Sequence, residues 1–208
     1  MSTKTKIVLL TCVALVFAAG GTGVALAFQP NAGPGELAAF QRAALPSDKP
    51  SPIVEELFGE LGLRAGEGRL IAAGVNATGV LRKLYLEPAD DGSVCYVVAD
   101  DALTSNVPVS CAPTDASFFS GAAAERSFTY SVHFEGSPQA PSELEVMGLT
   151  HPDAKVALIE VAFADGTTGR AEVSGDGGFW LEGSSQPVRL RAFASDGTLI
   201  EEVAGDGY

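Results

Sequence analysis

The carboxyl-terminal third of the chain alternates apolar and polar residues in short runs that end at glycine-containing turns. Within residues 155–164 the apolar side chains stand at every second position: Ala157, Ile159, Val161 and Phe163. This period places them on one face of a strand, and the following Asp165-Gly166 supplies the positive-φ residue of a tight turn. The pattern recurs, so further strands are predicted at 170–173, 179–181, 188–194 and 198–203. Short strands at this spacing predict a small antiparallel β-sandwich, Ig-like in kind, or an open barrel.

Residues 51–135 predict a short helix followed by more strands. Ser51-Pro52 is typical of a helix start, and apolar side chains then follow at helical spacing: Ile53, Val54, Leu57, Phe58 and Leu61. We expect this helix to end near Gly62 and to pack on its own domain. Residues 80–87 and 93–99 flank Asp90-Asp91-Gly92, which predicts a hairpin. Residues 127–135 alternate aromatic and polar side chains and predict a half-buried strand.

The chain therefore divides into four expected parts. Residues 1–28 form a signal peptide or membrane anchor, and residues 29–50, rich in Pro, Gly and Ala, form a stalk. Residues 51–135 hold the helix and a disulfide-tied β region, and residues 143–204 form the sandwich-like module. The stretch between them, 135–142, contains Gly136, Pro138 and Pro141 and is typical of a linker or long turn. The predicted fold class is mainly β.

The first 28 residues predict export. Lys4 and Lys6 precede 22 uncharged residues, 7–28, which contain Ala25-Leu26-Ala27 near their end, a pattern typical of a secretory signal cleaved after Ala27. The same stretch, at ~1.5 Å per helical residue, is long enough to cross a membrane as a retained helix. The lysines would then leave the amino terminus in the cytoplasm and the body outside. Both a membrane-anchored and a secreted form remain open.

Charge and cysteine content agree with an extracellular body. The net charge is −13, and all 26 acidic residues follow the leader, so binding to nucleic acid is not expected. Two cysteines remain after the leader, Cys95 and Cys111, and an oxidising compartment favours a disulfide between them.

No catalytic residue, metal site or cofactor is predicted. The two histidines, His133 and His151, lack a supporting motif and are expected at the surface. Gly175-Asp176-Gly177-Gly178 is the nearest approach to a calcium loop, but a turn accounts for it better. Trp180 could stack on a sugar, although a core position is the expectation. Asn76-Ala77-Thr78 matches a glycosylation sequon.

Three features resemble a group of uncharacterised exported proteins of high-GC Gram-positive bacteria. A short helix lies a few residues before an acid, from Phe40-Gln41-Arg42 to Asp48, and a strand ends in an isolated cysteine, Gly92-Ser93-Val94-Cys95. A turn, Gly148-Leu149-Thr150-His151-Pro152-Asp153, then opens a Val-rich strand that ends in Asp165-Gly166. His151 is an extra residue in that turn. The resemblance implies export and a β-rich extracellular domain, and it implies no activity.

The sequence therefore predicts an exported cell-envelope protein with a non-catalytic binding or structural role and an unidentified envelope or extracellular partner. Two alternatives stay open. One is an extracellular hydrolase whose site is assembled from dispersed residues. The other is a sugar- or calcium-binding β module centred on Trp180 or the Gly175 loop.

Overall fold

Antiparallel strands dominate the computed structural model, which describes residues 37–100, 107–113, 120–121, 124–137 and 140–205. All of these belong to one unit, Asn31–Tyr208, whereas the other unit, Met1–Pro30, lies outside the described residues. The helical elements are α1 (Ala38–Gln41), η2 (Pro46–Asp48), α2 (Pro52–Glu60) and η4 (Pro152–Ala154). Within the described ranges, no helix combines the length and the apolar character needed to cross a membrane. The expected leader lies outside these ranges.

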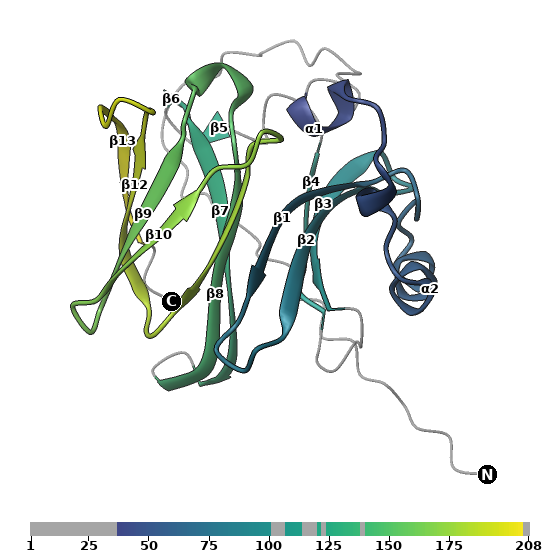
Figure 1. The fold of residues 1–208 in the computed structure, drawn as a ribbon, viewed down its shortest axis with the longest axis horizontal. Helices are drawn as coiled ribbons and strands as arrows, with labels where there is room; N and C mark the ends of the chain where they lie inside the picture. The colour runs from purple at the N-terminus through teal and green to yellow at the C-terminus, as the bar shows by residue number, and fades with distance from the viewer. Residues whose placement is uncertain (1–36, 101–106, 114–119, 122–123, 138–139, 206–208) are drawn as a thin grey trace, which may run out of the picture. The chain divides into compact units, whose positions relative to one another are not determined.

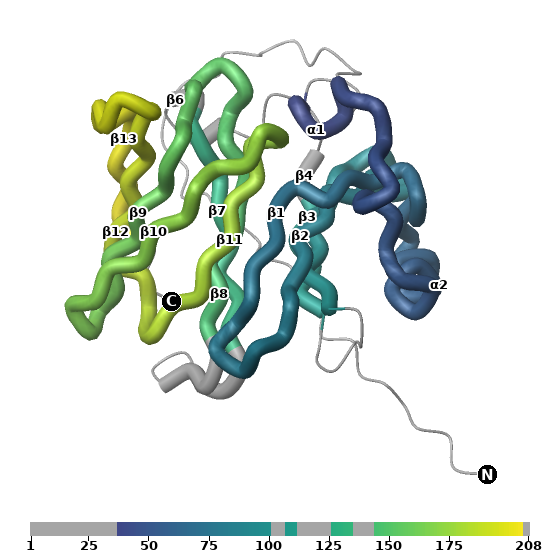
Figure 2. Tube along the Cα trace, in the orientation of Figure 1, coloured from purple at the N-terminus to yellow at the C-terminus, as the bar shows by residue number. Residues whose placement is uncertain are grey.

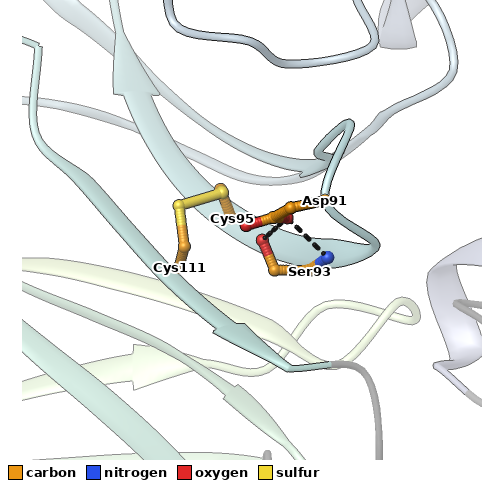
Figure 3. The surroundings of a disulfide bond; sticks show 4 residues. All are labelled: Asp91, Ser93, Cys95 and Cys111. Atoms are coloured by element: carbon orange, nitrogen blue, oxygen red, sulfur yellow. Dashed lines mark hydrogen bonds between the residues drawn. A yellow bond between two sulfur atoms is a disulfide. The ribbon is translucent and has the colours of Figure 1, made fainter. Parts of the chain in front are cut away.

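The first sheet contains β1 (Arg69–Val75), β2 (Leu81–Pro88), β3 (Ser93–Ala99) and β4 (Val109–Pro113) in that order. The hairpin expected around Asp91-Gly92 is confirmed as β2 and β3. Cys95 of β3 stands directly opposite Cys111 of β4, and the two residues form a disulfide with a Cα–Cα distance of 3.9 Å (Figure 3). The predicted disulfide is therefore confirmed, and it ties the edge strand β4 to the hairpin.

Two further sheets follow in the chain (Figure 1). The middle sheet has the order β11-β8-β7, with bounds Gly178–Gly183, Ala140–Thr150 and Phe128–Ser137. The outer sheet has the order β10-β9-β12-β13, with bounds Thr168–Glu172, Leu158–Phe163, Pro187–Phe193 and Leu199–Ala204. A separate short pair joins β5 (Ser120–Gly121) to β6 (Ala124–Glu125).

The middle sheet is buried on both faces. On one face Met147 and Leu149 pack with the apolar side of the first sheet, including Leu84, Leu86 and Val98. On the other face the middle and outer sheets share a core of large side chains: Phe128, Leu144, Val146, Ile159, Val161, Phe163, Phe179, Leu181 and Leu190. Successive residues of β8 point to opposite faces, so β8 contributes to both cores and is buried throughout residues 144–150.

Helix α2 covers the other face of the first sheet. Val54 and Phe58 are its buried residues, and Phe58 meets the ring of Tyr85 edge to face at 5.6 Å between centroids. The expected helix and its packing on its own domain are thus confirmed. Ile53, however, is 49% exposed, because the buried stripe follows Val54 and Phe58.

Five hairpin turns share one local geometry, which glycine determines. In each turn a first residue donates its N–H to the carbonyl four residues later, and a glycine three residues later donates back to it. The glycines lie at φ between +82° and +86°, and they are Gly79, Gly92, Gly166, Gly177 and Gly197. This is the three-residue loop in which a type I turn is followed by a left-handed glycine. The turn interpretation is therefore confirmed for the Asp-Gly pairs at Asp91, Asp165, Asp176 and Asp196, whereas Asp206-Gly207 lies outside the described residues.

The structure departs from the expected linker and stalk. Strands β7 and β8 extend through most of residues 135–142 and pair with each other down to Ser137 and Ala140. Likewise, Leu37 and Ala39 are buried in the core between the first and middle sheets, and Asp48 is 4% exposed. Residues 37–50 are thus packed against the β-sheets at Leu37, Ala39 and Asp48, whereas residues 43–47 are exposed, and residues 29–36 of the expected stalk lie outside the described ranges.

A buried ion cluster joins the first and middle sheets. Arg82 of β2 donates from Nε and Nη2 to the two carboxylate oxygens of Glu145 of β8, at 2.9 and 3.1 Å. Its Nη1 lies 3.3 Å from Asp100 Oδ2. The side chains of these three residues are at most 4% exposed. Burial of charge at this depth requires pairing, so each sheet depends on the other to satisfy its charges.

Replacement of Arg82 by Met is expected to lower the free energy of unfolding by about 3–5 kcal/mol, because Glu145 and Asp100 lose their buried guanidinium partner. Chemical denaturation measures this value. Arg170→Met is the matched control: it removes an arginine whose side chain is 67% exposed and is expected to cost at most about 1 kcal/mol. Equal losses in the two variants would contradict a coupling of the sheets through Arg82.

Candidate functional site

A row of apolar side chains crosses the exposed face of the outer sheet. Strand register places Phe193 of β12 opposite both Leu158 of β9 and Leu199 of β13. Leu199 is 49% exposed, and the other two are partly exposed. None of the three belongs to the hydrophobic cores described above. This apolar row (Leu158, Phe193 and Leu199) therefore remains available for contact.

A charged row runs beside the apolar row, two residues away on β9 and β12 and three residues away on β13, where the register shifts. It consists of one residue from each strand, in the spatial order Arg170, Glu160, Arg191 and Glu202. Glu160 accepts from Arg170 at 2.7 Å and lies 3.5 Å from Arg191, whose Nε donates to Glu202 at 2.6 Å. The hydrogen bond to Glu202 raises the pKa of Arg191. Signs therefore alternate along the charged row, and its net charge is zero.

A hollow of about 540 Å³ opens over part of these two rows, on β10, β9 and the end of β12. Leu158 and Phe193 line it from the apolar row, Glu160 and Arg170 from the charged row, and Glu172 from the end of β10. Its volume lies in the range of ligand sites, although it is open along the sheet. Apolar contact area beside fixed charges is the composition of a protein-contact surface. Figure 2 shows β10, β9, β12 and β13, the four strands of the outer sheet, lying side by side.

A second charged group fixes the segment that precedes α2. Arg42 donates from Nη1 and Nη2 to both oxygens of Asp48, at 2.6 and 2.7 Å, and from Nε to Asp176 at 2.8 Å. Asp48 also accepts the backbone N–H groups of Leu45 and Leu70. Burial alone would raise the pKa of Asp48, but these hydrogen bonds outweigh it and lower the pKa to about 2. All acceptor positions are thus used in holding three segments together, which is a structural role.

Glu87 of β2 is a buried carboxyl group of a different kind. It is 0% exposed, stands opposite Cys95 in the sheet and lies against Gly68, where a Cβ would be 2.1 Å from the carboxyl carbon. Neither carboxyl oxygen makes a hydrogen bond of standard geometry within the described ranges. Burial raises the pKa of Glu87 to about 8, although the Gly68 N–H and Arg69 act in the opposite direction. A pKa near 8 favours the protonated form of this carboxyl group at neutral pH.

The two histidines lie in different surroundings. His133 of β7 is directly opposite Glu145, beside the buried Arg82 cluster, and is only partly exposed. His151 accepts the N–H of Asp153 and lines a hollow of about 140 Å³ together with Gly175 and Gly177 of the β10–β11 turn. The structure therefore brings His151 and the Gly175 loop together. Within the described ranges, no group of three or more His, Cys, Asp or Glu side chains is arranged to hold a metal ion.

Trp180 and Asn76 both have local structural partners. A Cβ at Gly74 of β1 would lie 2.0 Å from the Trp180 ring, so this ring packs directly on the first sheet, as a core tryptophan does. Asn76 is 7% exposed, and its Oδ1 accepts from Val80 N and Thr78 Oγ1 at 2.8 Å each. Its side chain thus closes the β1–β2 turn, so the Asn76-Ala77-Thr78 sequence has a structural role that requires no glycan.

Sequence reasoning missed the outer face altogether. The members of the charged row lie on four different strands, 10 or 11 residues apart within each hairpin, and become neighbours through strand register. The available signal was that Glu160, Arg170, Arg191 and Glu202 each occupy an outward position of a predicted strand.

Glu87→Gln is expected to remove a pH dependence of stability. The native pKa of about 8 exceeds the unfolded value of 4.5, so the native state binds more protons between these limits. The free energy of unfolding of the wild type therefore falls as pH rises through that window, by a few kcal/mol at ~1.4 kcal/mol per pKa unit. Relative to the wild type, the Gln variant gains stability from pH 5 to pH 8.5 in urea titrations. Glu56→Gln, at an exposed position of α2, is expected to show no such gain; parallel behaviour of both variants would refute a neutral Glu87.

Comparisons with known proteins identify no relative from which a function could be inferred. No family model, curated protein or solved structure matches it. Function is therefore inferred from the disulfide, the leader sequence and the outer face.

Proposed function

We propose that this chain is an exported cell-envelope protein with a non-catalytic binding or structural role, and that it binds through the outer face. Two features support export. The leader sequence carries the basic start, apolar stretch and Ala-Leu-Ala end of a secretory signal. The Cys95–Cys111 disulfide fits an oxidising compartment. The body would be held outside the membrane by a retained leader, or secreted after cleavage near Ala27. The resemblance to exported proteins of high-GC Gram-positive bacteria agrees with both forms.

The carboxyl-terminal module is best described, in this proposal, as an Ig-like β-sandwich. Support comes from the single core that the middle and outer sheets share, to which both contribute alternate residues of their strands. Sandwiches of this kind commonly serve as rigid supports for contact surfaces in cell-surface proteins. Their sheets hold surface side chains in fixed positions, as the cross-strand ion pairs do here.

The observation that carries the binding role is the apolar row beside the charged row. A sheet face that met only water would be expected to carry polar residues at its outward positions. Here Leu158, Phe193 and Leu199 occupy three such positions in one row.

The buried ion cluster does not offer a comparable site for a hydrolase. Its two acids, Glu145 and Asp100, both pair with Arg82, but they are 0% and 3% exposed. A substrate has no access to them, so they do not favour a hydrolase.

Site-specific crosslinking on intact cells tests this function. In one variant a photo-reactive benzoylphenylalanine replaces Thr168, which lies on the outer face, so the charged row stays intact. In a matched control the same residue replaces Glu56 of α2. We expect ultraviolet light to produce adducts from position 168 and far fewer from position 56. A protease added to intact cells should then remove the protein. Equal crosslinking at both positions would contradict binding through this face, and protection from protease would contradict export.

A further inference from the structure

The order of charges in the charged row is complementary to the same row read in the opposite direction. Read across the outer sheet, its signs are plus, minus, plus, minus, from Arg170 to Glu202. The same row read backwards has the opposite sign at every position. A second copy turned by 180° about an axis parallel to the strands would therefore present an acid to each arginine and an arginine to each acid. Turned about the row itself, it would place like charges together.

We propose that the outer face is a two-fold interface between two copies of this chain. This inference rests on the proposed binding role of that face and names its partner. The axis runs between β9 and β12, so Arg170 faces Glu202 of the second copy. By the same rotation, Glu160 faces Arg191 of the second copy. Such an isologous contact uses one patch twice, as most homodimers do.

The apolar row supports the same arrangement. Rotation about an axis parallel to the strands keeps each row opposite its own counterpart, which brings the central members of the apolar row together and sets Leu199 opposite Glu172 of the second copy. Phe193 then lies against Leu158 of the second copy at the centre, on either side of the axis. Leu199 and Glu172 fall at the rim, where water remains. Apolar contact at the centre is therefore compatible with the orientation that charge complementarity selects.

The balance of charges on the outer face suits contact with a second copy, in contrast to the net negative charge of the chain. The net charge of −13 makes two copies repel one another at most approaches. On the outer face the arginines at 170, 189 and 191 balance the glutamates at 160, 172 and 202. In the proposed orientation no two like charges of the charged row meet. Like-charge repulsion is thus absent where the apolar row lies.

The size of the face sets the expected affinity. Four strands about 4.8 Å apart and about 3.3 Å per residue give a face of roughly 19 Å by 20 Å. Each copy would bury about 400 Å² in projection, which is roughly half the area per partner of a standard interface. We therefore expect a weak dimer, with a dissociation constant on the order of 0.1 mM.

Charge reversal at the two ends of the charged row tests the proposal. Arg170→Glu places acid opposite acid at both ends of its homodimer, and Glu202→Arg places arginine opposite arginine. Mixed together, however, these two variants are complementary at all four positions. Sedimentation equilibrium of the full chain isolated from producing cells, in non-ionic detergent if the leader is retained, measures each equilibrium. We expect each single variant to dimerise at least 10-fold more weakly than the wild type and the mixture to recover.

Two controls distinguish the loss of the dimer from misfolding and from a general effect of charge. Both substituted side chains are largely solvent-exposed, at 67% and 43%, and circular dichroism confirms that the variants fold. Glu56→Arg makes the same charge change on α2 and is expected to leave the equilibrium unchanged. A wild type that stays monomeric at 1 mM, or a mixture that does not recover, would overturn the dimer. Adducts from position 168 to a different protein would overturn it too, while leaving the proposed binding role intact.

Discussion

The structure depends on one constraint, which is that β8 must be covered on both faces. Its apolar residues point alternately to the two sides, with Leu144 and Val146 in one core and Met147 and Leu149 in the other. A strand of this kind is stable only between two other layers, because either face left open would expose a row of apolar side chains. The first sheet and the outer sheet supply those layers. Helix α2 then covers the remaining apolar face of the first sheet.

Polar contacts fix how these layers meet. Arg82 and Glu145 link β2 to β8 in the interior, while Arg42 links the segment before α2 to the β10–β11 turn through Asp176. Glu201 of β13 accepts from the backbone N–H of Ser127, just before β7, at 2.7 Å. Hydrophobic burial is not directional, so contacts of this kind determine register between sheets. The outer face of the last sheet is thereby held in a fixed shape, with its two rows exposed.

Local features of the fold could be predicted from the sequence, and non-local ones could not. Each Asp-Gly turn and the alternation in β9 depend on neighbouring residues, and both were recognised. Strand β8 was not predicted, because burial on both faces removes the alternation of apolar and polar residues. In the sequence, Glu145 is typical of a surface position, and only the fold places it beside Arg82, 63 positions away. The same holds for the charged row, whose members are assembled by strand register alone.

The most direct test of the account is native-state hydrogen exchange across the three sheets. If β8 is the layer on which both neighbours depend, the amides of Val146 to Leu149 should exchange most slowly. They should open only by global unfolding, with a free energy equal to that from denaturant titration. The first and outer sheets should then lose protection in the same cooperative step. Unfolding of either sheet at clearly lower free energy, with β8 still protected, would contradict the central role of the middle sheet.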